Sequence, residues 1–235
     1  MKNLNWIIII LVVVVISPIL LLIKNRPILN LQLFENQQFN AILNYQLTTL
    51  LIAGAVIGLV ALLTHGQALK LLSLNHLDGE IQPEPWIGIN PKNGETWKSL
   101  GWNFSIIITM VTAVVIFFQV VKNGSLAVNL FPGLLLVVLF ALSNSFVEEI
   151  IYRFSFVGVG LDLKISPLLI QGLAALTFGL VHYFGKPSGI FGVLLAAFIG
   201  WFLAKSMIET QGFFWSWFIH FLQDVVIYFA LLMTF

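Results

Sequence analysis

Long apolar runs separated by short polar segments dominate the chain. Seven of them approach the length of about 20 residues that an α-helix needs to cross the hydrocarbon core of a bilayer. These runs cover residues 6–23, 41–63, 102–121, 126–156, 167–184, 188–204 and 213–235. The pattern predicts an all-α, polytopic integral membrane protein with about seven transmembrane helices, within a range of six to eight.

Several features mark where these helices begin, end and pack. Gly158, Gly160 and Asp162 predict a loop after the fourth run, and Ser166-Pro167 is typical of an N-cap followed by the first residue of a helix. Small residues at four-residue spacing let membrane helices approach closely. Such a series lies in the sixth run, at Gly192, Ala196 and Gly200.

The longest polar segment, residues 65–100, is rich in glycine and proline and reads as a loop. Its first part, residues 68–77, is a candidate interfacial helix, and Trp86, Trp97 and Trp102 are candidate interface anchors. No polar stretch is long enough for a second core. We therefore expect one membrane domain over residues 1–235, with N-terminal spans and the Pro-rich loop in 1–100 and a catalytic helical core in 101–235.

Composition supports the membrane assignment. The chain is 59% hydrophobic and 9% charged, where soluble domains carry about 25% charged residues. The lipid bilayer is thus the expected partner, and a net charge of +1 gives no indication of nucleic acid binding. The absence of cysteine excludes disulfides, cysteine nucleophiles and thiolate metal sites.

Ionisable side chains are concentrated in the C-terminal spans, whereas the first three spans carry essentially none. A charged side chain at mid-membrane costs roughly 3 kcal/mol and is by default a candidate functional residue. The ionisable residues in or beside the C-terminal spans are Glu148, Glu149, Arg153, His182, His220 and Asp224. The distribution predicts one polar pocket between spans four, five and seven, with the first three spans as scaffold or gate.

Helix geometry divides the roles within the first cluster. Glu149 and Arg153 are i, i+4 neighbours on one helical face and form a natural ion pair. Glu148 points elsewhere and is left without a dedicated cation, which suits a general base. The alternative is that all three residues form a structural ionic network that fixes helix packing.

The histidines extend the candidate chemistry to the activation of water. His220 and Asp224 are also i, i+4 neighbours, the spacing at which a carboxylate can orient an imidazole. Together with Glu148 and His182 they can activate water directly or through a metal such as zinc, because two histidines and a glutamate match a zinc ligand set. The H-E-x-x-H helix of zinc proteases and the G-x-S-x-G serine motif are both absent. The cofactor stays open between none and a divalent metal.

Three sequence motifs, in their order along the chain, resemble those of a known family. The series Glu148-Glu149-x-x-x-Arg153, Phe178-x-x-x-His182 and His220-x-x-x-Asp224 resembles the signature of the CAAX-protease and bacteriocin-processing family, also called Abi proteins. These intramembrane endopeptidases are related to the type II CAAX prenyl endopeptidase. The resemblance covers about residue 131 to the C-terminus.

The resemblance implies peptide-bond hydrolysis inside the bilayer, with a hydrophobic or membrane-associated peptide as substrate. Glu148 and His182 would activate water, and His220 and Asp224 would stabilise the oxyanion. Glu149 and Arg153 would support the site. An ionised Asp224 cannot donate a hydrogen bond, so we expect it to orient His220 instead. Both glutamate-dependent and metal-dependent mechanisms are compatible with this family.

Two other functions remain open. The first alternative to a protease is a non-proteolytic immunity or scaffold protein with a purely structural ionic network. The second is a transporter or proton relay, because such proteins also use intramembrane Glu and His. No internal repeat of the kind common in transporters is visible. The expected location is the plasma membrane of a prokaryote, and the oligomeric state is open.

Overall fold

The computed structural model describes residues 2–26, 28–122 and 130–233. Over these residues the chain is all-helical, with two isolated β-bridges and no β-strand. The long helices are α1 (Lys2–Asn25), α2 (Gln37–Leu63), α3 (Trp97–Ile116), α4 (Leu130–Glu149), α6 (Pro167–Val181), α7 (Gly189–Thr210) and α8 (Phe214–Met233). The shorter ones are the 3₁₀ helices η1 (Gln67–Leu72), η2 (Pro85–Ile87) and η5 (His182–Phe184), the π-helices η3 (Phe117–Val121) and η4 (Ile150–Phe154), and α5 (Ser155–Asp162).

Seven helical segments within these ranges are long and apolar enough to cross a membrane. The fourth of them, Gly133–Asp162, joins α4, η4 and α5 into one span of 30 residues. The predicted all-α, multi-pass membrane fold with about seven spans is confirmed. The start of the fourth run lies outside the described residues.

The loop predicted at Gly158 and Gly160 is wrong, because both glycines lie inside α5. They serve close packing. A Cβ on Gly158 would lie 2.9 Å from the Cβ of Ala68, and one on Gly160 would lie 2.5 Å from Ile170. A glycine in a membrane helix therefore marked a contact between elements here, whereas a soluble chain would more often use it for a turn.

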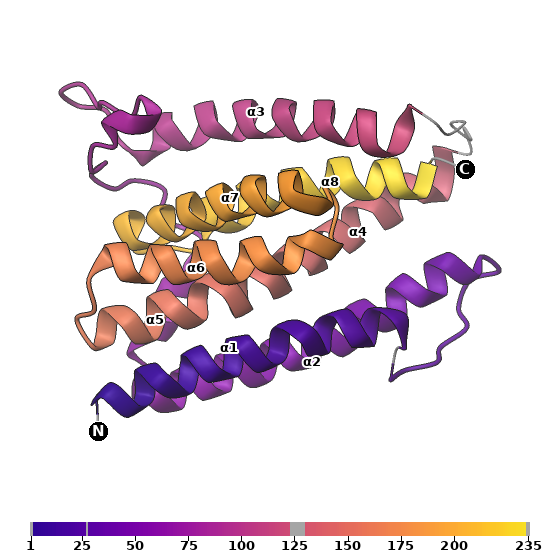
Figure 1. The fold of residues 1–235 in the computed structure, drawn as a ribbon, viewed down its shortest axis with the longest axis horizontal. Coiled ribbons are helices and arrows are strands. Elements are labelled where there is room, and N and C mark those ends of the chain that lie inside the picture. The colour runs from indigo at the N-terminus through magenta and orange to yellow at the C-terminus, as the bar shows by residue number, and fades with distance from the viewer. Residues whose placement is uncertain (1, 27, 123–129, 234–235) are drawn as a thin grey trace.

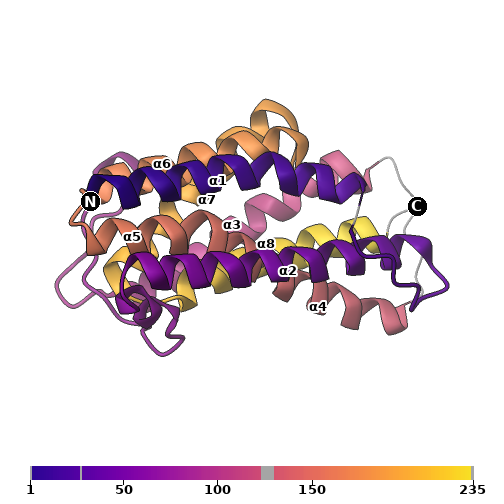
Figure 2. The same cartoon turned by 90° about the horizontal axis from the view of Figure 1, so that it is seen from below.

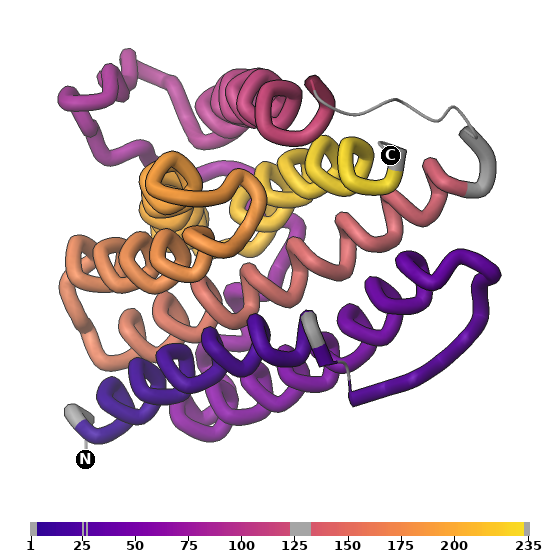
Figure 3. Tube along the Cα trace, turned by 45° about the vertical axis from the view of Figure 1, so that its right-hand side comes forward, coloured from indigo at the N-terminus to yellow at the C-terminus, as the bar shows by residue number. Residues whose placement is uncertain are grey.

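The helices form a bundle with the fourth and seventh spans near its centre. The α1–α2 hairpin and α3 lie on opposite sides of the bundle (Figures 1 and 3). Seen from below, α1 and α2 lie in front of the other helices (Figure 2). The hairpin packs on α4 and α5, while α3 packs on α8. α1 begins and α8 ends at opposite ends of the bundle, as an odd number of spans requires.

The α6–α7 pair is packed through small residues, as the sequence predicts. A Cβ on Gly200 would lie 2.8 Å from the backbone oxygen of Ala174, and one on Gly179 would lie 2.8 Å from the Cβ of Ala197. Ser166 is the N-cap of α6, with Pro167 in its first turn. This pair carries the end of α6, and with it His182, toward the centre of the bundle.

The segment between α2 and α3 folds back onto the junction of α7 and α8. Glu209 of α7 accepts hydrogen bonds from the indole Nε1 of Trp97, at 2.7 Å, and from the backbone of Gln82, at 3.2 Å. Trp97 is fully buried, so it is not an interface anchor, whereas Trp86 and Trp102 are exposed. The candidate interfacial helix is reduced to the 3₁₀ turns of η1.

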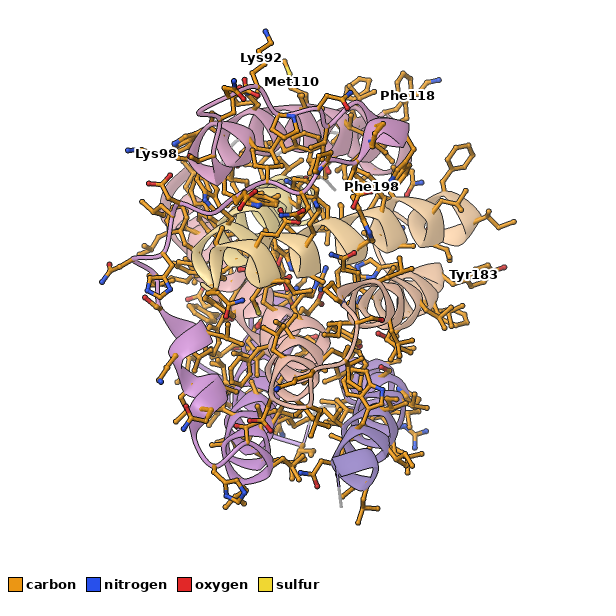
Figure 4. All side chains as sticks on the ribbon, turned by 90° about the vertical axis from the view of Figure 1, so that its left-hand side faces the viewer. Lys92, Lys98, Met110, Phe118, Tyr183 and Phe198 are labelled. Carbon is orange, nitrogen blue, oxygen red and sulfur yellow. The ribbon has the colours of Figure 1, made fainter. Side chains whose placement is uncertain are left out.

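Large apolar side chains cover much of the outer surface, as lipid contact requires. Met110 and Phe118 project outward from the third span, and Tyr183 projects from the end of the fifth (Figure 4). Lys92 in the loop before α3 and Lys98 in the first turn of α3 point away from the bundle (Figure 4). Charged groups inside the bundle are therefore exceptional, and most of them lie around Glu149, Arg153, His220 and Asp224.

Candidate active site

The six ionisable residues singled out in the sequence come together from three spans. Glu148 and Glu149 end α4, Arg153 lies in the π-helix η4, and His182 begins η5. His220 and Asp224 lie one turn apart on α8. Four of the six line a common cavity, namely Glu148, His182, His220 and Asp224. Glu149 and Arg153 are buried behind it.

Glu149 connects the other buried groups. Its Oε1 lies 3.2 Å from Nη1 of Arg153, which is the ion pair expected from their spacing. The same oxygen lies 2.7 Å from Nδ1 of His220. Both Glu149 and Arg153 are fully buried, and the distortion from α- to π-helix begins directly after Glu149. π-helical turns of this kind are frequent at functional sites.

The ring of Phe178 contacts Arg153 and both histidines. The guanidinium carbon of Arg153 lies 3.7 Å from the centre of this ring, a cation–π geometry. The rings of His182 and His220 lie 4.3 and 5.5 Å from it, measured between ring centres. Phe178 thus holds both imidazoles in place while it shields the buried cation from the cavity.

Hydrogen-bond partners determine the tautomers of the two histidines. Nδ1 of His182 lies 2.8 Å from the backbone oxygen of Phe178. A carbonyl oxygen only accepts, so this nitrogen carries the proton and Nε2 of a neutral His182 is an acceptor. By the same argument, Nδ1 of His220 donates to Glu149, and its Nε2 faces the cavity carboxylates.

Glu148 is the more accessible of the two adjacent glutamates. Its side chain is 19% exposed, and its Oε2 lies 3.5 Å from Nε2 of His220. Its Oε1 accepts a hydrogen bond of 3.1 Å from Asn144. No lysine or arginine among the described residues pairs with it. The geometry agrees with the division of roles drawn from helical angles, in which Arg153 belongs to Glu149.

Asp224 is not the residue that holds His220 most closely. Its Oδ2 lies 3.8 Å from Nε2 of His220, beyond hydrogen-bond distance, and accepts a hydrogen bond of 3.0 Å from Asn144 instead. Glu149 makes the 2.7 Å contact on the other ring nitrogen. The i, i+4 spacing places Asp224 beside His220, but Glu149 from α4 orients the imidazole ring.

The cavity has a volume of about 600 Å³ and a mostly apolar wall. Residues of all seven spans line it, those of spans four, five and seven among them. Phe104 and Val111 of α3 and Phe198 of α7 form part of the apolar wall. The cavity extends to the end of the bundle where α1 ends and α7 begins, and exposed Lys24 and Lys186 lie there.

The uncharged polar groups of the site were not predicted from the sequence. Asn144 bonds both cavity carboxylates, and Nε2 of Gln46 in α2 lies 2.7 Å from the hydroxyl of Tyr228. Asn144 precedes Glu148 by one helical turn, and Gln46 is an amide inside a charge-free apolar run. A search for amides as well as charges in the spans would have found both.

A zinc-type site does not fit these residues. In the part of the chain that the structure describes, no three His, Asp or Glu side chains are arranged to hold a metal ion. Nδ1 of each histidine is engaged, by Phe178 or by Glu149, so only Nε2 of each ring would be free to bind a metal. We derive no step through a metal.

Comparison with known families agrees with this geometry. Residues 129–226 match the family described as type II CAAX prenyl endopeptidase Rce1-like. These residues form an Rce1-like domain. All six ionisable site residues lie within the Rce1-like domain, and the family supports a protease. No curated protein and no solved structure gives a significant match to the chain.

Proposed function

We propose that this protein is an intramembrane endopeptidase that hydrolyses peptide bonds of hydrophobic or membrane-associated peptides. The observation that carries the proposal is the convergence of Glu148 with His182 and His220 on the wall of one cavity. A carboxylate and two imidazoles around a space large enough for water and a peptide are suited to general acid–base hydrolysis. The Rce1-like domain supports the same reaction class.

In the proposed reaction, Glu148 is the general base. It takes a proton from water while the water oxygen attacks the peptide carbonyl carbon. The unprotonated Nε2 of His182 accepts a hydrogen bond from the same water and so helps to orient it. Glu148 then delivers its proton to the leaving nitrogen as the carbon–nitrogen bond breaks, which leaves a carboxylic acid and an amine.

His220 is the proposed donor to the oxyanion. Its Nδ1–H is held by Glu149, so a second proton on Nε2 makes the ring an imidazolium beside Glu148 and Asp224. Donors already aimed at a developing oxyanion are often the largest single contribution to catalysis. Asp224 supplies negative charge that favours this imidazolium. Arg153 offsets the charge of Glu149 from behind the site.

The apolar wall suits the hydrophobic side chains that a membrane-associated peptide would present. We propose the plasma membrane of a prokaryote as the location, with maturation of peptides or self-immunity to bacteriocins as biological roles. These roles rest on the resemblance to the CAAX-protease and bacteriocin-processing family.

The test uses the full-length protein purified into lipid nanodiscs and incubated with peptides extracted from the membranes of the expression host. Mass spectrometry then detects new peptide termini. We expect Glu148→Gln, His182→Gln and His220→Gln each to lower their rate of appearance by about 10²–10⁴-fold, the usual contribution of a general acid or base. His65→Asn is the matched control. His65 is exposed and left-handed, with φ 50°, a conformation that asparagine also adopts.

The outcomes separate the candidate functions. New termini that depend on Glu148 support the protease. A wild-type protein that produces none, or a Glu148→Gln protein that produces as many, contradicts it. In that case, a Glu148→Gln/His182→Gln/His220→Gln protein that retains its biological activity favours a scaffold. Proton flux into vesicles that is lost with Glu148→Gln favours a relay.

A further inference from the structure

We propose that Asn144 and Gln46 form an amide relay that positions the two cavity carboxylates for the reaction. The proposal rests on the proposed protease function and adds two positioning residues to it. It also gives α2 a role in the site. α2 lies outside the Rce1-like domain of residues 129–226.

Asn144 donates both hydrogens of its amide nitrogen to carboxylates. Nδ2 lies 3.1 Å from Oε1 of Glu148 and 3.0 Å from Oδ2 of Asp224. An ionised carboxylate only accepts, so Nδ2 and not Oδ1 must face these two groups. One rigid amide therefore fixes the separation of two like charges that would otherwise repel each other.

Gln46 holds Asn144 from the other side. Its Nε2 lies 3.4 Å from Oδ1 of Asn144 and donates to the hydroxyl of Tyr228 at 2.7 Å. Its Oε1 accepts a hydrogen bond of 2.6 Å from Ser143. Gln46 is only 2% exposed, so each of its polar atoms depends on these partners.

The direction of the relay follows from these partners. The hydroxyl of Ser143 donates to Gln46, Gln46 donates to Asn144, and Asn144 donates to the carboxylates. On Glu148, Asn144 binds Oε1, the oxygen that does not face His220, whereas on Asp224 it binds Oδ2, the oxygen nearest to that ring. Oε2 of Glu148 is thereby left to face His220 and the attacking water. Asp224 is held 3.8 Å from the imidazole and does not close onto it.

Loss of the relay should lower turnover more than substrate binding. Without Asn144, Asp224 is free to pair directly with Nε2 of His220, and Glu148 loses its fixed rotamer. We expect Asn144→Leu to lower kcat by about 10- to 100-fold, the range for outer residues that orient a reacting group. KM should change little, because neither amide is proposed to contact substrate. Gln46→Met should give a smaller loss in the same direction.

The probe is a synthetic fluorogenic copy of a peptide that the wild-type protein cleaves in a Glu148-dependent manner. Rates are expressed per folded molecule, counted by size-exclusion chromatography in nanodiscs. The double variant should be no slower than Asn144→Leu alone, because Gln46 acts through Asn144 and the two losses are not additive. A purely structural role would lower the folded fraction and leave kcat per folded molecule unchanged.

Matched controls lie on the same two helices. The hydroxyl of Ser145 bonds only its own helix, at 2.7 Å from the oxygen of Ala141 in the closer of two such contacts. Thr48 likewise bonds the oxygen of Asn44, at 2.8 Å. Ser145→Ala and Thr48→Val should keep the wild-type kcat.

The result that overturns the relay is a wild-type kcat in both Asn144→Leu and Gln46→Met. The protease proposal would survive that result, since it depends on wild-type cleavage and on its loss in Glu148→Gln. If Asn144→Leu does not fold, Gln46→Met decides alone. A reduced kcat with unchanged KM supports the relay, and an unchanged kcat refutes it.

Discussion

Oε1 of Glu149 lies 2.7 Å from Nδ1 of His220, across the interface of α4 and α8. The neighbouring Glu148 reaches the opposite nitrogen of the same ring, at 3.5 Å. Two consecutive glutamates therefore hold one imidazole from both of its nitrogens. They differ in their surroundings, because Glu149 is fully buried with Arg153 whereas Glu148 opens to the cavity.

This arrangement predicts an order of activity loss. Glu149→Gln should lower turnover more than Asp224→Asn, because it removes the negative charge that lies closer to the His220 ring, at 2.7 Å against 3.8 Å. Asn at position 224 can still accept from Asn144 through its carbonyl oxygen. Initial rates of the two variants with one fluorogenic peptide test the order. A greater loss in Asp224→Asn would return the orienting role to Asp224.

The buried ion pair predicts a difference between single and double variants. Glu149→Leu leaves Arg153 buried without its carboxylate, and removal of one partner of a buried pair costs about 3–5 kcal/mol. The double variant Glu149→Leu/Arg153→Met removes the stranded cation as well. We expect it to unfold at a higher temperature than Glu149→Leu in the same detergent, as followed by tryptophan fluorescence. A double variant that is less stable than Glu149→Leu would contradict this account.

The sequence predicted the spans and the charged residues well for a physical reason. Both predictions depend on the cost of exposing a polar group to lipid, and this cost can be judged from the type of each residue alone. The Glu149–Arg153 pair was also predictable, because i, i+4 neighbours meet within one helix.

Contacts between spans could not be predicted in this way. Glu149 with His220 and Asn144 with Asp224 join residues that are 71 and 80 positions apart. Only the packing of α4 on α8 decides which of them meet. The same limit explains Gly160, which packs against Ile170 and was expected in a loop.

The small-residue contact between α6 and α7 predicts opposite effects for two glycines. A Cβ on Gly200 would lie 2.8 Å from the backbone oxygen of Ala174, which cannot rotate away. A Cβ on Gly172 of α6 would have no heavy atom within 4 Å. Gly200→Ala should therefore destabilise the protein by about 1–3 kcal/mol. Gly172→Ala should leave stability unchanged or raise it by up to about 1 kcal/mol. Thermal unfolding of both variants in one detergent checks the sign, and equal shifts would refute the close contact.

The contacts of Lys205 predict how the segment between α2 and α3 is held. This lysine is 1% exposed, and its Nζ pairs with Glu209 and lies 3.5 Å from Glu84 and 2.8 Å from the backbone oxygen of Gln82. Hydrogen bonds to a charged group contribute about 1.5–3 kcal/mol. Lys205→Met should therefore raise the population of the detached segment by about tenfold or more.

A Glu-specific protease measures this opening, because Glu80, Glu84 and Glu95 lie within the segment and the substitution removes none of its sites. We expect faster cleavage there in Lys205→Met than in the wild type, read by mass spectrometry of the fragments. Lys98→Met is the matched control, since Lys98 is exposed next to the segment and pairs with none of the described residues. Equal cleavage rates in the two variants would show that Lys205 does not hold the segment. Faster cleavage in Lys205→Met alone would assign that role to the buried amine, because both variants lose one positive charge.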